Sequence, residues 1–215
     1  MKLITEVYDQ VNYISEARQD GKKDYFIEGV FLQSEVVNRN GRRYPRETMT
    51  KEVARYNENY VMKSRAYGEL GHPAGPTINL DRVSHMIKEL KQDGNNVVGR
   101  AKIMDTPMGT IVKNLMDEGA SLGVSSRGLG TLREKAGVNE VQGDFMLATA
   151  ADIVADPSAP DAFVQGIMEN VEWIQESGVW IAKDIEMAQK AMHSASKEDI
   201  AKVQLGIFED FISKL

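Results

Sequence analysis

The feature that most constrains the fold is a pair of strand-like runs on either side of a tight-turn signal. The runs cover residues 82–90 and 96–104, and the residues between them include Asp93-Gly94. Asp-Gly is favoured in two-residue hairpin turns, because both central residues of such a turn adopt positive φ. The sequence therefore predicts an antiparallel β-hairpin over residues 82–104.

Further strands and helices are predicted on both sides of this hairpin. A run rich in β-branched and aromatic residues, 25–37, ends in turn residues at 38–41. Pro45 and the Thr106-Pro107 pair are typical of helix N-termini. The prediction places strands at 25–37, 65–70, 122–126, 129–134 and 143–154, and helices at 46–59, 107–118 and 161–170. This pattern indicates an α+β domain.

The two ends of the chain are predicted to be helical and to lie outside the central domain. Apolar residues spaced along 1–17 suit a short amphipathic helix followed by a polar linker. Two more helices are predicted over 181–193 and 196–215. This tail either packs on its own domain, which is the simpler interpretation, or is a removable or partner-binding segment. We divide the chain into an N-terminal appendage (1–23), a central domain (24–176) and a helical C-terminal tail (177–215).

Composition excludes several functional classes. The formal charge of −6 gives no electrostatic footprint for nucleic acid. The chain has no cysteine and its three histidines lack the spacing of a zinc site, so we expect neither a metal nor another cofactor. No apolar run approaches the ~20 residues of a membrane span, and the N-terminus does not resemble a signal peptide. We therefore expect a protein that works inside a cell, or inside something assembled there.

A glycine-rich stretch, Gly-Val-Ser-Ser-Arg-Gly-Leu-Gly at 123–130, carries the candidate catalytic chemistry. Glycines permit a tight bend, so a serine here is predicted to lie on a turn beside free backbone N–H groups. A serine nucleophile needs a base within hydrogen-bond reach, and His72 is the candidate base. Asp152 interrupts an apolar strand, where a charge needs a partner, and is the candidate carboxylate that orients the histidine.

Alternatives to these assignments stay open on the residues alone. Asp152 could equally be an edge-strand residue that faces water, and Glu69 or Asp161 could replace it. His85 lies within the predicted hairpin and is interpreted as structural, and His193 is given no catalytic role.

The same stretch has a competing interpretation as a phosphate-binding loop. It lacks the lysine of a P-loop and the spacing of a dinucleotide-binding motif, so we discount that use. The backbone N–H groups of Arg127 and Gly128 are instead predicted to form an oxyanion hole, with the Arg127 guanidinium adding positive potential.

Taken together, these motifs resemble the prohead core serine proteases of T-even-like tailed bacteriophages. The resemblance runs from about Tyr25 to Ala162. The residues that carry it are Gly68-Glu69-Leu70-Gly71-His72-Pro73, the stretch 123–130, Asp-Ile-Val-Ala-Asp-Pro-Ser-Ala-Pro-Asp-Ala at 152–162, Ile27-Glu28-Gly29-Val30-Phe31 and Val36-Val37-Asn38-Arg39-Asn40. One departure is Gly71, where asparagine is the more familiar residue.

The resemblance implies an endopeptidase of the immature phage head, in the host cytoplasm, that degrades scaffold and core proteins, trims the major capsid protein and processes itself. It also implies the fold of the herpesvirus maturation protease, a small mixed β-barrel with surrounding helices. Matched by motif, Ser125 is the nucleophile, His72 the catalytic histidine and Asp152 the third member. A non-catalytic prohead scaffold or core protein with a protease-like fold is the alternative, and a homo-oligomer is a further expectation.

The family's cleavage after glutamate in Ile/Leu-x-Glu directs attention to such triplets in this chain. Triplets of this form end at Glu6, Glu89, Glu134, Glu169, Glu176 and Glu209. Since several fall in or beside the two ends, the hypothesis is a zymogen whose terminal pro-segments are removed by the enzyme itself. The glutamate-binding site is expected to be basic, with Arg39, Arg42, Arg43 and Arg65 as candidates.

Overall fold

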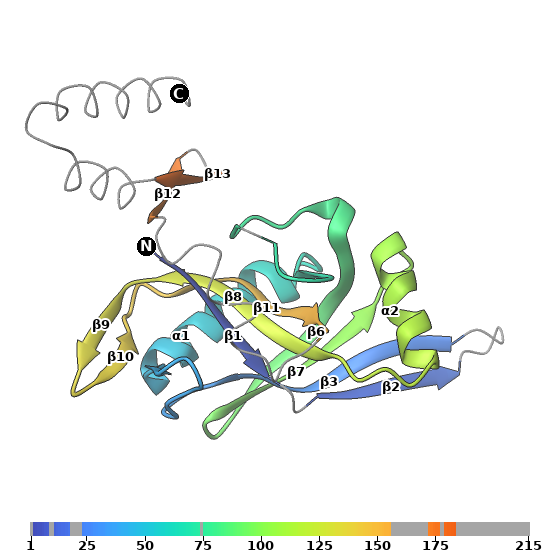
Figure 1. The fold of residues 1–215 in the computed structure, drawn as a ribbon, viewed down its shortest axis with the longest axis horizontal. Coiled ribbons are helices and arrows are strands. Elements are labelled where there is room, and N and C mark those ends of the chain that lie inside the picture. The colour runs from blue at the N-terminus through green and yellow to red at the C-terminus, as the bar shows by residue number, and fades with distance from the viewer. Residues whose placement is uncertain are drawn as a thin grey trace, which may run out of the picture.

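Strands dominate the architecture of the computed structural model, which describes residues 2–8, 11–17, 23–73, 75–155, 172–176 and 179–183 (Figure 1). The strands are β1 (Lys2–Tyr8), β2 (Val11–Ala17), β3 (Lys23–Gln33), β4 (Arg42–Arg43), β5 (Tyr67–Glu69), β6 (Val83–Asp93), β7 (Asn96–Ile103), β8 (Gly123–Gly130), β9 (Leu132–Lys135), β10 (Val138–Val141), β11 (Met146–Val154), β12 (Glu172–Glu176) and β13 (Val179–Lys183). The helices are α1 (Arg46–Tyr56) and α2 (Pro107–Asp117), with short turns η1 (Asn57–Val61) and η2 (Leu80–Arg82).

The largest sheet contains the predicted hairpin. Its strand order is β2-β3-β7-β6-β5, and every adjacent pair is antiparallel. β6 and β7 pair up to Asp93 and Asn96, so the hairpin is confirmed, but its two turn residues are Gly94-Asn95 and not the predicted Asp93-Gly94. β3 confirms the apolar strand expected from residue 25, and its side chains Ile27 and Phe31 are fully buried in the core.

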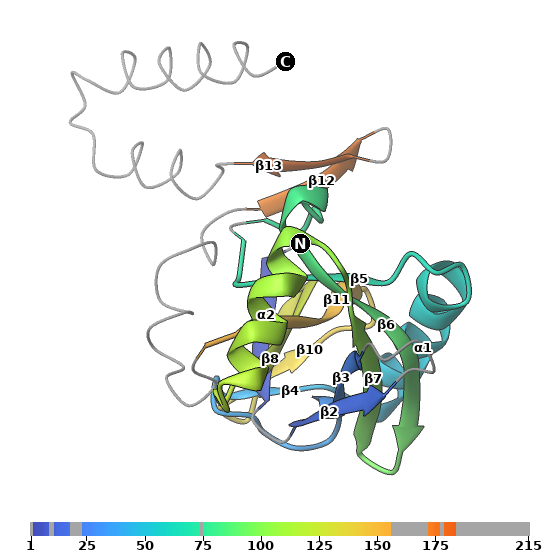
Figure 2. The ribbon, with the colours of Figure 1, turned by 90° about the vertical axis from the view of Figure 1, so that its right-hand side faces the viewer.

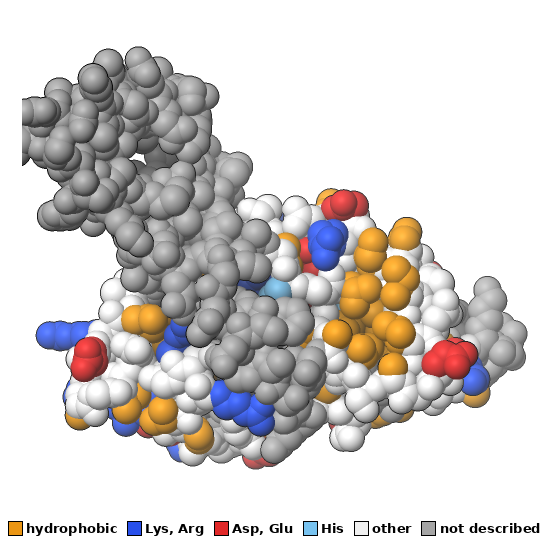
Figure 3. All heavy atoms as spheres, viewed as in Figure 1, with side chains coloured by type: hydrophobic (Ala, Val, Ile, Leu, Met, Phe, Trp, Pro, Cys, Tyr) orange, Lys and Arg blue, Asp and Glu red, His pale blue; other side chains and the backbone are white. Residues whose placement is uncertain are grey.

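Two helices flank the strands, at opposite sides of the molecule in the view turned by 90° (Figure 2). Both begin where the sequence predicts: α1 follows Pro45, and the Thr106 hydroxyl accepts a hydrogen bond of 3.0 Å from Gly109 N at the start of α2. Apolar side chains gather on the surface over α2 (Figure 3), where Ile111 and Leu115 are exposed.

A second sheet, of order β1-β8-β11, overturns the prediction of an N-terminal helix. Residues 2–8 and 11–17 form strands, and β1 lies along the whole of β8 (Figure 1). Ile4 and Glu6 are buried while Thr5 between them is half-buried, which is the two-residue period of a strand. The apolar residues of this short N-terminal segment fit the period of a helix as well as the period of a strand.

Other parts of the prediction are also corrected. The strand expected over 129–134 is divided between the end of β8 and β9, which pairs with β10 through the two-residue turn Ala136-Gly137, and β11 pairs with β8. Residues 181–183 belong to β13 and not to a helix. The helices expected over 161–170 and 196–215, and the remainder of 181–193, lie outside the described residues.

The ladders of the described strands form four open sheets. Besides the two above, these are β4-β10-β9 and the hairpin β12-β13. Within the described part of the chain no sheet closes on itself, so the barrel implied by the resemblance is not found there. The mixed fold that the sequence indicates is present, with strands outnumbering helices.

Candidate active site

Ser125 lies in the middle of β8, which is the central strand of its sheet and is buried along its entire length. The predicted turn is therefore wrong, and the glycines have a different role. A Cβ on Gly128 would lie 2.7 Å from the Phe145 ring, and one on Gly130 would lie 3.2 Å from Ile4 Cδ1. The glycines leave room for these neighbours while the strand carries Ser125 straight through the sheet.

Asp152 is held directly beside the serine. β11 runs antiparallel to β8 with Asp152 opposite Ser125, after an irregular step in register that follows Thr149. Residues opposite each other across a ladder place their side chains on the same face. The carboxylate is fully buried, so it is not an edge residue facing water.

His72 reaches this pair from the loop after β5, which is bonded to the end of β11. Leu70 forms a parallel bridge with Ile153, and Gly71 N donates a hydrogen bond of 2.7 Å to Ile153 O. Gly71 has a φ of +80°, in the left-handed region that glycine and asparagine tolerate best. Glycine therefore supplies the same turn that asparagine, the more familiar residue, would supply.

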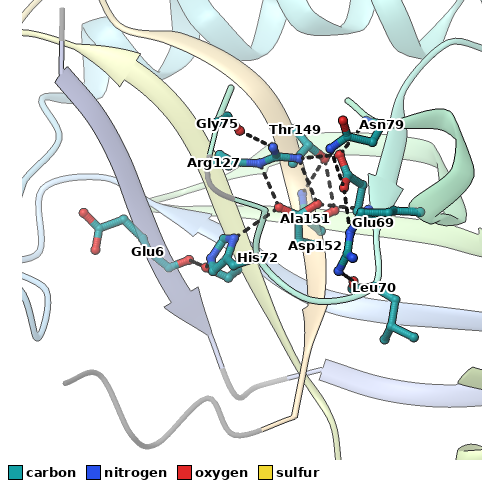
Figure 4. A network of polar contacts seen from close by, with 12 residues as sticks. Glu6, Glu69, Leu70, His72, Gly75, Asn79, Arg127, Thr149, Ala151 and Asp152 are labelled. Atoms are coloured by element: carbon teal, nitrogen blue, oxygen red, sulfur yellow. Dashed lines mark hydrogen bonds and ion pairs between the residues drawn. The ribbon is translucent and has the colours of Figure 1, made fainter. Parts of the chain in front are cut away.

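The three side chains form a continuous chain of contacts, of which Figure 4 shows the part from His72 to Asp152. His72 Nε2 lies 2.5 Å from Ser125 Oγ, and His72 Nδ1 lies 3.3 Å from Asp152 Oδ2. The second contact is an ion-pair distance without the alignment of a hydrogen bond. Catalytic hydrogen bonds that are long in a resting structure commonly tighten in the transition-state complex. A proton on Nδ1, facing the carboxylate, leaves Nε2 free to accept the serine proton.

The Arg127 guanidinium, which was predicted to add positive potential beside an oxyanion hole, lies in a buried cluster of carboxylates. It is fully buried and bonds to Asp152 Oδ2 through Nε at 3.0 Å and to Glu69 Oε1 through Nη2 at 3.1 Å. The oxyanion role predicted for the backbone N–H groups of Arg127 and Gly128 is not supported, because a strand rises about 3.3 Å per residue and these residues lie two and three positions along β8 from Ser125. Oxyanion donors must lie about 3 Å from the developing charge, and only a tight turn would have brought these residues there.

The alternative carboxylates are separated by the same geometry. Glu69 is fully buried but directs its carboxylate to Arg127 and to the backbone N–H of Asn79, at 2.9 Å. Its own N–H donates to Asp152 Oδ1 at 2.9 Å, which further fixes the carboxylate that faces His72. Glu69 thus supports Asp152 and does not replace it, and Asp161 lies outside the described residues.

His85 belongs to the structural surroundings of Asp152. It is fully buried, with Nε2 lying 2.9 Å from Ala151 O and Nδ1 lying 2.8 Å from the Ser84 hydroxyl. Burial lowers the pKa of His85 from 6.5 to about 4, with the nearby Asp152 charge opposing the shift. A neutral, fully hydrogen-bonded imidazole supports the structural interpretation of this residue.

Glu6 is the residue of this site that sequence reasoning placed elsewhere. Its carbonyl oxygen lies 2.9 Å from Ser125 Oγ. Its carboxylate is buried on a different side, in contact with Arg42 at 3.3 Å, Tyr44 Oη at 3.1 Å and Asn40 Nδ2 at 2.7 Å. The pKa of Glu6 is raised above its ordinary value by burial, and the charge of Arg42 only partly offsets this shift. The sequence signal for this residue is the triplet Ile4-Thr5-Glu6. Its place beside Ser125 becomes apparent only in the structure.

The described residues also bear on other functions. They contain no group of three or more histidine, cysteine or acidic side chains arranged to hold a metal ion. No helix among them has the length and apolar character needed to cross a membrane.

Comparisons with known proteins find similar sequences and a similar structure. A family model described as prohead core protein serine protease matches residues 5–172. The chain is similar to the prohead core protein protease of Enterobacteria phage T4, with 39% identity over 147 residues that cover 66% of this chain and 69% of the relative. It is also similar to the solved structure of the bacteriophage T4 capsid assembly protease, gp21. That match has a TM-score of 0.66 and 34% identity, and it covers 71% of this chain and 97% of the other.

Proposed function

Because this chain belongs to the prohead core protein serine protease family, we propose that it is a serine endopeptidase in which Ser125, His72 and Asp152 are the catalytic group. The observation that carries the proposal is the continuous contact from Ser125 Oγ through the His72 ring to the Asp152 carboxylate. A buried serine, a neighbouring imidazole and a fixed carboxylate are the parts that acyl transfer requires.

In this mechanism His72 takes the proton of the Ser125 hydroxyl as Oγ attacks the carbonyl carbon of the substrate. The imidazolium that forms is stabilised by Asp152, and it then donates the proton to the leaving amine. Water, activated by the same imidazole, hydrolyses the acyl-enzyme and restores the serine. Asp152 is itself held by the Glu69 N–H and the Arg127 guanidinium, so its orientation does not depend on substrate.

The substrate class follows from the family and from the chain's own triplets. We propose cleavage after glutamate in Ile/Leu-x-Glu, within the prohead in the host cytoplasm, of scaffold, core and major capsid proteins. The T4 relatives, named for the prohead core and for capsid assembly, support that setting. The terminal pro-segments (1–23 and 177–215), a homo-oligomeric state and the herpesvirus-type barrel remain proposals of the same kind.

Incubation of purified protein, followed by intact-mass analysis, tests this function. Wild type is expected to shorten itself and to cut a synthetic Ile-Thr-Glu peptide amide, whereas Ser125→Ala does neither. Ser126→Ala is the matched control, because it removes the same atom from the next residue and is expected to keep both reactions. Loss of neither reaction in Ser125→Ala would reject the nucleophile. A wild type that cuts nothing favours a non-catalytic scaffold or core protein.

A further inference from the structure

β1 lies against the nucleophile in the manner of a bound substrate strand. It pairs antiparallel with β8, and the register sets Glu6 opposite Ser126 and Val7 opposite Ser125. An extended peptide that adds a strand to a sheet edge is a common mode of peptide recognition. Together with the 2.9 Å contact of Glu6 O and Ser125 Oγ, this register brings the Glu6–Val7 peptide bond to the serine.

The Glu6 side chain enters a closed pocket of complementary polarity. Its residue is only 1% exposed, and its two carboxylate oxygens receive bonds from Arg42 Nη1, Tyr44 Oη and Asn40 Nδ2. A buried carboxylate is tolerated only with such charge and hydrogen-bond partners. Figure 4 shows the Glu6 carboxylate pointing away from the Asp152 cluster, so this pocket is separate from the catalytic group.

The loop that forms the pocket is held in shape by its own hydrogen bonds. Asn38 Oδ1 accepts from the backbone N–H of Asn40 at 3.1 Å and of Arg42 at 2.9 Å. Such side-chain to backbone bonds fix tight turns. Arg42 then begins the short strand β4, paired with β10, which anchors it to the domain. The pocket is therefore part of the domain, while its occupant arrives on β1.

The same loop also contacts the backbone just before the glutamate, and the residue two places before the glutamate packs beside β8. Asn40 Nδ2 and Arg42 Nη1 each lie 3.3 Å from Thr5 O. Ile4 is 1% exposed and fills the space beside Gly130. Thr5, between Ile4 and Glu6, is half-buried. An enclosed isoleucine, an outward middle residue and an enclosed glutamate reproduce the pattern Ile-x-Glu.

Building on the proposed protease function, we propose that Asn40, Arg42 and Tyr44 form the pocket that selects glutamate, and that β1 occupies it as the enzyme's own first substrate. Of the four arginines proposed from the sequence for the glutamate-binding site, Arg42 is the one that contacts the Glu6 carboxylate. Arg43 pairs with Glu140, and the Arg39 and Arg65 residues are exposed. The bond to be cleaved lies between Glu6 and Val7.

The reaction is balanced without any further cofactor. Ser125 Oγ bonds to the Glu6 carbonyl carbon, the Glu6–Val7 bond breaks, and the serine proton passes through His72 to the new amino group of Val7. A water molecule then adds its hydroxyl to the Glu6 acyl carbon and its proton to Ser125 Oγ. The products are a six-residue peptide that ends in Glu6 and a chain that begins at Val7.

Other triplets differ from Glu6 in what surrounds them. Glu89 and Glu134 lie within β6 and β9, and Glu176 ends β12. A seventh triplet, missed on the sequence, ends at Glu16 in β2, where the carboxylate pairs with Arg100. Among the triplet glutamates that the structure describes, Glu6 is the one whose carbonyl oxygen contacts Ser125 Oγ. Glu6–Val7 is therefore expected to be cleaved first.

The first experiment follows self-cleavage of the full chain by N-terminal sequencing and intact mass. The expected first product begins at Val7, and its rate constant does not change over a hundredfold range of protein concentration, because the bond lies in its own site. A first cut elsewhere overturns the assignment of β1. A rate constant proportional to concentration overturns its seating in the same molecule.

The second experiment tests the pocket with two peptide amides, Ile-Thr-Glu and Ile-Thr-Gln. Arg42→Gln and Asn40→Asp are expected to reduce kcat/KM for the glutamate peptide by ~10–100-fold, the loss typical of hydrogen bonds to a charged group. Cleavage of the glutamine peptide changes far less, so the preference for glutamate collapses. Arg46→Gln, an exposed change of equal charge nearby, keeps wild-type rates. Thermal midpoints check that Arg42→Gln is folded, and Asn40→Asp, nearly isosteric, gives an independent result.

These outcomes are distinct from failure of the protease proposal itself. If wild type cuts neither itself nor the glutamate peptide, the protease function falls and the pocket with it. If wild type cuts the glutamate peptide and both pocket variants retain its preference over glutamine, only the pocket assignment is overturned.

Discussion

Two buried clusters of arginine and carboxylate lie on either side of β8, and they differ in where the carboxylate comes from. On the β11 side, Arg127 binds Asp152 and Glu69, and all three side chains are fully buried. On the β1 side, Arg42 binds Glu6, again almost completely buried. The first cluster is made by side chains of β5, β8 and β11, whereas the second is completed by a segment that we propose is a substrate.

The difference indicates two uses of the same chemical pair. A buried ion pair adds little net stability, but it fixes orientation when every oxygen is bonded. In the Asp152 cluster the fixed orientation positions the carboxylate toward His72. Removing a partner there leaves buried charges that cannot reach water. In the Glu6 cluster the carboxylate can leave with its strand, and Arg42 then meets water or the glutamate of another substrate.

The largest expected effect comes from a pair of isosteric changes, Asp152→Asn and Glu6→Gln. Asp152→Asn removes the carboxylate that holds the imidazole, so kcat/KM for the Ile-Thr-Glu peptide is expected to fall by ~10⁴-fold. Glu6→Gln slows only the cut after residue 6, by ~10–100-fold. Peptide kinetics and intact mass measure the two losses separately. Equal losses in both assays would erase the distinction between the clusters.

The next effect is on stability, measured by urea unfolding in a Ser125→Ala background that prevents self-cleavage. Arg127→Met leaves the buried Asp152 without an arginine partner and Glu69 with only Arg82, at 3.5 Å, and is expected to lower the free energy of unfolding by about 3–5 kcal/mol. Arg42→Met is expected to cost at most about 2 kcal/mol, because β1 can release Glu6 to water. A loss at Arg42 as large as that at Arg127 would mean that β1 is a permanent part of the domain.

The sequence predicts the Asp152 side of the site far better than the Glu6 side. His72 and Asp152 stand in motifs that resemble a known family, and the hairpin and helix starts depend on local signals such as Asp93-Gly94 and Thr106-Pro107. The prediction that Ser125 lies on a turn was wrong about its backbone, and its assignment as the nucleophile stays a prediction. Three glycines near a serine indicate a turn locally, while the ring of Phe145, distant in sequence, explains Gly128 in a strand.

The Glu6 side depends on contacts that no local pattern contains. Ile4 and Glu6 are separated from their partners in β8 by more than a hundred residues, and a seven-residue apolar pattern suits either a helix or a strand. Arg127 shows the same limit, because its charge near a serine suggests an oxyanion site. Only the register of β11 reveals that Asp152 and Glu69 bind it.

The third prediction concerns acid sensitivity on the Asp152 side, where His85 packs. Its pKa is lowered to about 4 in the folded protein, from 6.5 in the unfolded chain, so the unfolded state binds the proton first as pH falls. Stability is thus present above pH 6.5 and is lost toward pH 4, by about 3 kcal/mol. In the Ser125→Ala background, urea midpoints at pH 7 and 4.5 are expected to differ less in His85→Gln. An unchanged difference would contradict this origin.

The smallest effect has the opposite sign and belongs to the Glu6 side. Burial raises the pKa of Glu6 in the folded protein, so the folded state binds this proton more readily than the unfolded chain. The contribution is complete below the ordinary pKa of 4.5 and is lost as pH rises through the raised value. Ser125→Ala should therefore gain urea stability over Ser125→Ala/Glu6→Gln as pH falls. A gain on raising pH would mean that attraction to Arg42 outweighs the burial of the carboxylate, and β1 would then bind most tightly with Glu6 ionised.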